Sequence, residues 1–194
     1  MTISSANFES YLKSFIQDTS LNDQIPVILE KFDYLHLKKN TLFVEEGTIC
    51  KYFCFIESGI LQHNILVEGE EKTTYLALKK SATAALKSFM HQIPSRKNMK
   101  AISDCDLFVI NQNDFQYLLS TNEAFHKFYY NLIENQIYRI DDYRIDLLTL
   151  TPEERYKKML VNEPKLLKEV PLHYLASFLG ISSRHMSRIR KSVK

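Results

Sequence analysis

The placement of glycine constrains the fold of this chain more than any other feature. Only four glycines occur among its 194 residues, and Gly47, Gly59 and Gly69 all fall between residues 41 and 78. Between them lie short runs at 52–56 and 60–67 that are rich in aromatic and β-branched residues, as is typical of strands. Evenly spaced turns with short strands between them predict a jelly roll or a small β-barrel.

The rest of the first 112 residues completes this barrel domain. Further strands are expected at 72–78 and 101–110, and helices at 8–16 and 25–30 should pack against the barrel. A hydrophobic content of 45% is sufficient for a core of this size. We therefore predict a domain over residues 1–112 and a separate organisation for the remainder of the chain.

A long helix is predicted after the barrel, behind a short helical segment at 114–119. Residues 123–148 contain neither glycine nor proline, and Asn122 before them is a suitable N-cap. A helix of this length extends roughly 39 Å. Phe125, Phe128 and Leu132 form one apolar edge that should lie on the barrel.

A second stripe on this helix predicts dimerisation. Its members recur at alternating steps of four and three, the spacing of a two-stranded coiled-coil seam. They are Tyr129, Ile133, Gln136, Ile140, Tyr143 and Leu147. The alternative is that the whole helix packs within its own subunit, which is the usual fate of an apolar stripe. We favour a homodimer through a dimerisation helix at 113–148, because one small core cannot cover a helix of this length.

The start of a C-terminal domain is marked by the sequence Thr151-Pro152-Glu153-Glu154. Threonine as the N-cap, proline at the first helical position and Glu154 at the third form a capping box. Residues 148–150 are then a hinge, and residues 149–194 a separate domain. The helix after the hinge should give Tyr156, Met159 and Leu160 to a small core. Residues 161–169 could form either a hairpin or a loop.

Two further helices joined by a tight turn are predicted near the C-terminus. The first should bury an apolar face and the second should begin at the N-cap Ser182. Gly180 between them can adopt a positive φ, as a sharp turn requires. The inward residues are expected to be Leu172, Leu175, Ala176, Leu179, Ile181, Met186 and Ile189, and the outward residues Ser183, Arg184, Ser187 and Arg188. This arrangement is a helix-turn-helix.

Charge is concentrated on the second of these helices. The chain carries a formal charge of +2, but residues 171–194 contain five basic residues and no acid, which leaves −3 on the first 170 residues. The basic residues are Arg184, Arg188, Arg190, Lys191 and Lys194. Double-stranded DNA attracts such a patch, since each cation that meets a phosphate releases condensed counterions. A solvated basic helix is the alternative for a charge run alone.

Residues 170–191, above all 175–182 and 186–190, resemble the DNA-binding end of Crp/Fnr-type transcription regulators. The resemblance implies an α+β fold: an N-terminal jelly roll or double-stranded β-helix like a cyclic nucleotide-binding domain, a dimerisation helix and a winged-helix-like helix-turn-helix domain. It also implies a cytoplasmic, homodimeric regulator that binds double-stranded DNA, with RNA polymerase as a further partner. The DNA-binding residues would be Ser182, Ser183, Arg184, Ser187, Arg188, Arg190 and Lys191.

The sequence argues against cyclic AMP as the effector. Nucleotide-binding members of the family have a Gly-Glu pair and, further along, an Arg-Ser/Thr-Ala run, whereas residues 81–101 contain no glycine and no acid. We therefore expect weak or absent cyclic AMP binding and leave the effector unidentified. Ser95, Arg96 and Lys97 are candidates for contact with an anion, although solvated surface charges explain them as well.

Other functional classes find little support. Cys50, Cys54 and Cys105 are an odd number without a Cys-x-x-Cys pair, so we expect reduced thiols and no disulfide framework, zinc ribbon or N-terminal iron–sulfur site. The six histidines are scattered, and no catalytic, metal-binding or cofactor motif occurs, so no enzyme is expected. No apolar run approaches the ~20 residues of a membrane span. The remaining alternative is a barrel that binds a metabolite or partner without binding specific DNA sequences.

Overall fold

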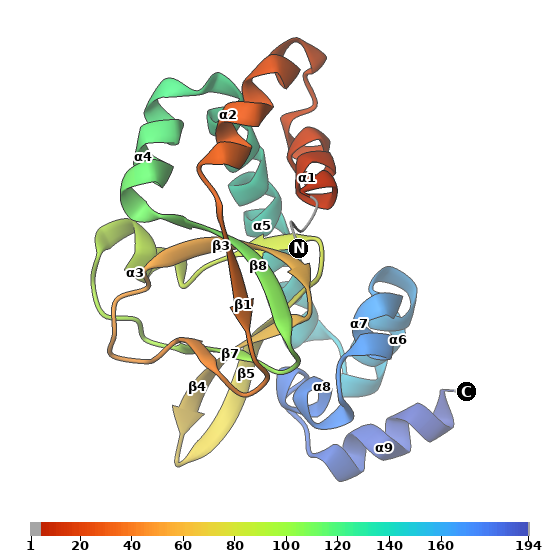
Figure 1. Cartoon of the computed structure of the whole chain (residues 1–194). Helices are drawn as coiled ribbons and strands as arrows, with labels where there is room; N and C mark the ends of the chain where they lie inside the picture. The colour runs from red at the N-terminus through yellow and green to blue at the C-terminus, as the bar shows by residue number, and fades with distance from the viewer. Residues whose placement is uncertain (1–4, 194) are drawn as a thin grey trace.

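The computed structural model describes residues 5–193 as a β-barrel, a long helix and a small helical domain (Figure 1). The strands are β1 (Asp33–Leu37), β2 (Leu42–Val44), β3 (Tyr52–Ser58), β4 (Ile60–Val67), β5 (Glu70–Leu78), β6 (Ser81–Thr83), β7 (Asn98–Ala101) and β8 (Cys105–Asn111). The helices are α1 (Ala6–Ile16), η1 (Thr19–Gln24), α2 (Ile25–Glu30), α3 (Leu86–His91), α4 (Gln112–Thr121), α5 (Glu123–Thr149), α6 (Pro152–Asn162), α7 (Pro164–Glu169), α8 (Leu172–Phe178) and α9 (Ser183–Ser192).

Two antiparallel four-stranded sheets form the barrel, in the orders β1-β8-β3-β6 and β2-β7-β4-β5. The strand predicted within 101–110 is confirmed as β8, whereas Ala101 ends β7. Because β7 and β8 belong to different sheets, the chain turns between them. Gly59 lies at this crossing with φ of 89°. A Cβ atom there would lie 2.3 Å from the carbonyl oxygen of Asp104, so only glycine fits.

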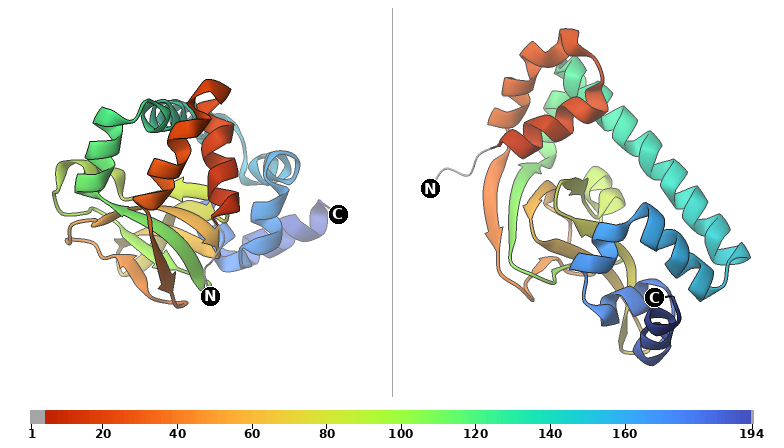
Figure 2. Two further views of the ribbon diagram at one scale, coloured as in Figure 1. Left: turned by 45° about the horizontal axis from the view of Figure 1, so that its top comes forward. Right: turned by 90° about the vertical axis from the view of Figure 1, so that its right-hand side faces the viewer.

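Helices α1, α2, α4 and the first half of α5 cover one end of the barrel (Figure 1). Phe8 of α1 stacks on Phe55 of β3 with ring centroids 4.7 Å apart. Phe125, Phe128 and Leu132 of α5 are buried in the same core, as predicted from their spacing. Asn122 caps α5 by accepting a hydrogen bond from the backbone N–H of Phe125 at 2.8 Å. This end of the molecule anchors α5 to the barrel, while its second half extends away (Figure 2).

The C-terminal domain, residues 150–193, consists of helices α6 to α9 and the turns between them. The predicted capping box is present: Thr151 Oγ1 accepts from the N–H of Glu154, and Glu154 accepts from the N–H of Thr151. Residues 161–169 form neither a hairpin nor a loop, because Pro164 starts the short helix α7. No strand occurs within residues 150–193.

The core of this domain differs from its prediction at one residue. Tyr156 and Met159 of α6 are buried, but Leu160 is 39% exposed. A residue directly after Met159 is rotated by about 100° around the helix and therefore leaves the core. Leu166 and Leu167 of α7 occupy this space instead.

The barrel and the C-terminal domain share part of one hydrophobic core. Ile60, Leu76 and Ile102 of the barrel belong to the same buried cluster as Leu175 and Met186 of the last two helices. The C-terminal helices lie beside β4 and β5 (Figures 1 and 2). The positions of the domain boundaries, at residues 112 and 148, stay a prediction.

Candidate nucleic-acid interface and interdomain cavity

Helices α8 and α9 are joined by a tight turn that the local sequence explains. Gly180 has φ of 70°, and its N–H donates to the carbonyl of Ser177 at 3.1 Å while the N–H of Ile181 donates to the carbonyl of Ala176 at 2.9 Å. This pair of bonds is the Schellman ending of a helix. Ser182 then starts α9 by accepting from the N–H of His185 at 3.2 Å. The two predicted helices and the tight turn between them are therefore present.

One face of α9 is buried and the other is open. Leu175, Ala176, Leu179, Met186 and Ile189 form the small core, and Leu172 and Ile181 pack against it. Among the predicted DNA-binding residues, Ser187 is half-buried and the others are exposed: Ser182, Ser183, Arg184, Arg188, Arg190 and Lys191. We call the exposed side chains of α9 the basic face.

The basic face carries uncompensated charge. Within residues 5–193, no acidic side chain lies within ion-pair distance of Arg184, Arg188, Arg190 or Lys191. Lys194, the fifth basic residue of the sequence pattern, lies outside the described residues. Exposed cations without intramolecular partners are free to meet an external polyanion.

Some residues of the predicted seam on α5 face the interior of the subunit, and others are exposed to solvent. Tyr129 packs inward on Phe115 with ring centroids 5.1 Å apart, and Tyr143 stacks on Phe178 of α8 at the same separation. Gln136 is half-buried and faces a cavity. Ile140 and Leu147 are 66% and 52% exposed. Half of the predicted seam is thus occupied within the subunit.

A different stripe of α5 is open. Tyr130 and Ile137 are 59% and 58% exposed and line a shallow groove with the half-buried Ile133. The stripe follows α5 at successive steps of three, four, three and seven residues. It comprises Tyr130, Ile133, Ile137, Ile140 and Leu147. It keeps the predicted period but moves every second position by one residue. The reason is that Tyr129 packs on Phe115, Gln136 faces the cavity and Tyr143 packs on Phe178. We call it the outer stripe.

A cavity of about 790 Å³ lies between the barrel, α5 and the C-terminal domain. The barrel contributes His63, Tyr75, Thr83 and Lys97, and α5 contributes Gln136, Arg139 and Tyr143. Asn162, Leu166 and Phe178 line it from the C-terminal domain. All three parts of the molecule therefore line one partly open cavity.

His63 is the cavity residue that the sequence did not reveal. Its side chain is 2% exposed, and its Nε2 lies 2.9 Å from the hydroxyl of Thr83. Its Nδ1 is buried without a partner. Burial, with a smaller contribution from the charge of Lys97, holds the pKa of His63 well below its usual value. A neutral imidazole with one unused nitrogen faces the cavity.

Of the three residues predicted to contact an anion, the structure brings only Lys97 to the cavity. Ser95 donates its hydroxyl hydrogen to the carbonyl of Lys97 at 2.7 Å, and Arg96 is exposed. Burial lowers the pKa of Lys97. Two of the acids that line the cavity are paired, Asp146 with Lys158 at 2.6 Å and Glu163 with Arg139 at 3.5 Å. The third, Asp142, forms no ion pair within residues 5–193.

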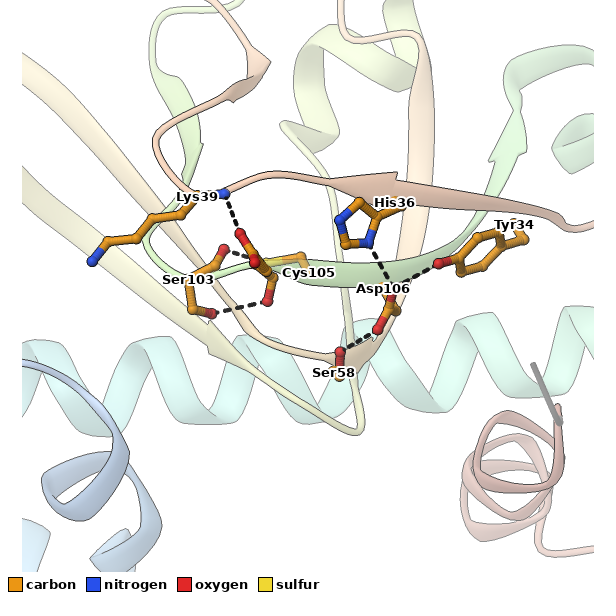
Figure 3. Close-up of polar contacts among 8 residues, drawn as sticks. Tyr34, His36, Lys39, Ser58, Ser103, Cys105 and Asp106 are labelled. Atoms are coloured by element: carbon orange, nitrogen blue, oxygen red, sulfur yellow. Dashed lines mark hydrogen bonds and ion pairs between the residues drawn. The ribbon is translucent and has the colours of Figure 1, made fainter. Parts of the chain in front are cut away.

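A second polar cluster lies on the exposed side of the β1-β8-β3 sheet (Figure 3). The carboxylate of Asp106 accepts from the Tyr34 hydroxyl at 2.6 Å, from the Ser58 hydroxyl at 2.7 Å and contacts His36 Nδ1 at 2.9 Å. Hydrogen bonds from His36, Tyr34 and Ser58 lower the pKa of Asp106. Because side chains from both neighbouring strands, β1 and β3, occupy the carboxylate on β8, this cluster stabilises the sheet.

Within residues 5–193, no group of three or more His, Cys, Asp or Glu side chains is placed to bind a metal ion. Over the same residues, no helix is both long enough and apolar enough to cross a bilayer. Cys50, Cys54 and Cys105 are buried free thiols, as predicted.

Known proteins share this architecture. Residues 34–122 match the family model described as cyclic nucleotide-binding domain. FixK2 from Bradyrhizobium japonicum is similar over 84% of this chain and 84% of its own, with a TM-score of 0.71 and 12% identity. A protein assigned to the Crp/Fnr family from Eubacterium rectale is similar over 90% of this chain and 82% of its own, with a TM-score of 0.65 and 17% identity. This chain shares the fold of Crp/Fnr-family proteins.

The likeness in fold extends over most of the chain. The Catabolite Activator Protein of Thermus thermophilus is similar over 92% of this chain and 85% of its own, with a TM-score of 0.57 and 18% identity. At such identities the likeness establishes the shared fold. Among curated protein sequences, none matches this chain.

Proposed function

We propose that this protein is a homodimeric, Crp/Fnr-like transcription regulator that acts in the cytoplasm and binds double-stranded DNA through the basic face of α9. The observation that carries this proposal is the basic face itself: exposed cations, unpaired within residues 5–193, on the second of two helices joined by a tight turn. A solvated basic helix would not require the buried Ala176 or the Gly180 turn that hold α9 against α8. The turn and the buried Ala176 hold α9 so that its basic side chains face the solvent.

Arg184 and Arg188 are suited to read bases. They lie four positions apart and therefore on the same side of α9. An arginine can donate two hydrogen bonds to O6 and N7 of guanine in the major groove, at about 1 to 3 kcal/mol of discrimination per base pair. Ser182, Ser183 and Ser187 add hydroxyl donors, while Arg190 and Lys191 are placed to contact phosphates.

Two copies of the protein would pair through the outer stripe of α5. Four of its five residues are exposed in the single chain, although the stripe recurs at the spacing of a coiled-coil seam. A two-fold dimer can place two α9 helices in successive major grooves about 34 Å apart. This pairing supports recognition of inverted-repeat sites.

The cavity is our candidate for the effector site. Lys97 supplies a partly buried positive charge, and His63 supplies an unused nitrogen. Burying a charge is costly unless a ligand or side chain pairs with it, so a small anion is the favoured class of effector. Within the described residues the barrel offers the cavity no carboxylate for a ribose hydroxyl, so cyclic AMP should bind weakly or not at all. Micromolar cyclic AMP affinity by calorimetry would overturn this expectation.

The competing proposal is a ligand-binding barrel that does not bind specific DNA sequences. Arg184→Ala/Arg188→Ala separates the two, with Lys165→Ala/Lys168→Ala as a control that removes two exposed cations elsewhere in the same domain. In a mobility-shift assay, we expect the first variant to lose the preference for a selected site and the control to keep it. Equal effects in both variants would favour the competing proposal. RNA polymerase as a partner is a further part of our proposal, testable by co-purification with the DNA-bound protein.

A further inference from the structure

A serine of α8 bonds to the backbone of the barrel's edge strand. The Oγ of Ser177 accepts from the N–H of Thr73 at 2.9 Å and donates to the carbonyl of Glu71 at 3.2 Å. Both backbone groups belong to β5, the last strand of the order β2-β7-β4-β5. One hydroxyl thus satisfies a donor and an acceptor where the next strand would have paired. We call this the Ser177 contact.

The register of β5 explains why these groups are free. His63 of β4 is paired with Tyr75, and Asn64 with Thr73, so Thr74 is an extra residue that shifts the register. An edge strand presents unpaired N–H and C=O groups, and a bulge increases its local twist. The C-terminal domain covers this part of the edge with α8 (Figure 2, right).

Other contacts between the two domains flank the Ser177 contact. Lys79, at the end of β5, pairs with Glu169 of α7 at 3.0 Å. The hydroxyl of Tyr143 on α5 donates to the carbonyl of Phe178, the residue after Ser177, at 2.9 Å. Polar contacts from the barrel and from α5 therefore converge on α8.

We propose that Ser177, assisted by the Lys79–Glu169 pair, is a positioning residue that fixes the angle between the barrel and α9. The only covalent link between α5 and α6 is the short segment of Leu150 and Thr151. A second, non-covalent attachment would remove the freedom of that hinge. Because α9 follows α8 directly and shares its core, holding α8 also holds α9.

The consequence lies in the spacing of DNA sites. The Ser177 contact leaves the basic face of α9 and the outer stripe of α5 exposed, so it orients the C-terminal domain and does not block it. This inference rests on the proposed function. In a dimer paired through α5, the angle of each domain sets the distance between the two α9 helices. Ser177 would then determine which half-site spacings the dimer accepts.

The contact can first be tested without DNA, by amide hydrogen exchange measured with NMR. Ser177→Ala removes the acceptor of the Thr73 N–H, and we expect exchange at Thr73 to become about tenfold faster, the scale of one lost hydrogen bond. Ser192→Ala is the control, since its hydroxyl bonds only within α9, to the carbonyl of Ile189. Exchange at Thr73 that is as fast in the unmodified protein as in Ser177→Ala would overturn the contact.

Positioning is then tested with DNA sites whose half-sites differ in separation by single base pairs. For Ser177→Ala and Lys79→Glu we expect unchanged affinity for an isolated half-site, but about tenfold weaker discrimination between spacings. The reversed pair Lys79→Glu/Glu169→Lys should restore discrimination. Retained spacing preference in Ser177→Ala would contradict the inference. Failure of the unmodified protein to bind any DNA would contradict the proposed function and also the positioning role, while the exchange experiment still decides the contact itself.

Discussion

Both the basic face of α9 and the interdomain cavity contain unpaired cations, but in opposite surroundings. Arg184 and Arg188 are exposed to water, whereas Lys97 is partly desolvated and burial lowers its pKa. An exposed cation can await a polyanion without a desolvation cost, while a buried cation destabilises the fold until an anion joins it. The same charge therefore suits a surface for binding DNA in one place and a site for a small molecule in the other.

Two basic faces, one from each subunit of a dimer, should bind DNA together. Disrupting the outer stripe should therefore give the largest loss of DNA affinity among these predictions. Ile137→Asp places a charge in the proposed dimer interface, so we expect monomers by analytical ultracentrifugation. Affinity for an inverted-repeat site should fall by about 100-fold or more, because linked binding of two modules contributes a factor of 10² to 10⁴. Asn135→Asp, which adds the same charge at an exposed position outside the outer stripe, should leave the dimer intact. A dimeric Ile137→Asp protein would contradict pairing through this stripe.

At Arg188 of the basic face, contact with a base should contribute more to DNA affinity than electrostatic attraction to phosphates. Arg188→Ala removes a proposed bidentate contact, so its preferred site should lose about 1 to 3 kcal/mol, or roughly 5- to 150-fold in affinity, and the preference at one base pair should relax. Binding to a library of variant sites measures both quantities. Unchanged affinity with unchanged preference would exclude Arg188 as a base reader.

Burial of His63 in the cavity should make the free energy of unfolding depend on pH. The pKa of His63 lies well below 6.5 in the folded protein, so below that pH the unfolded chain binds a proton that the folded protein does not. The free energy of unfolding should therefore decrease as the pH falls below about 6.5. Chemical denaturation at about pH 7.5 and pH 5.5 should show a smaller decrease in His63→Gln than in the unmodified protein.

A matched histidine controls this experiment. His91 is exposed at the end of α3, so His91→Gln should retain the full decrease in unfolding free energy. An identical pH dependence in His63→Gln and His91→Gln would show that His63 is not buried in its neutral form.

Lys191 should give the smallest effect. As a phosphate contact it attracts all DNA sequences alike, so Lys191→Ala should weaken every site by a similar factor. The slope of log affinity against log salt should decrease in magnitude by about 0.9. Titrations at several salt concentrations measure this slope, and a sequence-dependent loss would instead assign Lys191 to base reading.

Features determined by neighbouring residues could be predicted from the sequence. The Gly180 turn, the Ser182 and Asn122 caps and the Thr151 capping box are all present, because each depends on contacts within a few positions. The inward positions of Met186 and Ile189 followed from helical spacing alone.

Features determined by distant contacts could not be predicted. Tyr129 and Tyr130 are chemically identical, and only the packing of Phe115 decides which one faces inward. Nothing next to His63 in the sequence marks it as a cavity residue, since Thr83 and Lys97 reach it from other parts of the barrel. The break between β7 and β8 likewise arises from the change of sheet rather than from a turn motif.

The most direct test of the central claim is the selection of bound sites from random double-stranded DNA by the unmodified protein. If two α9 helices read successive major grooves, the enriched sequences should be inverted repeats with half-site centres about one helical turn, ~34 Å, apart. Guanine should be enriched within each half-site if Arg184 and Arg188 contact bases. Failure to enrich any sequence at low salt, or enrichment of single half-sites alone, would contradict a dimeric DNA-reading regulator.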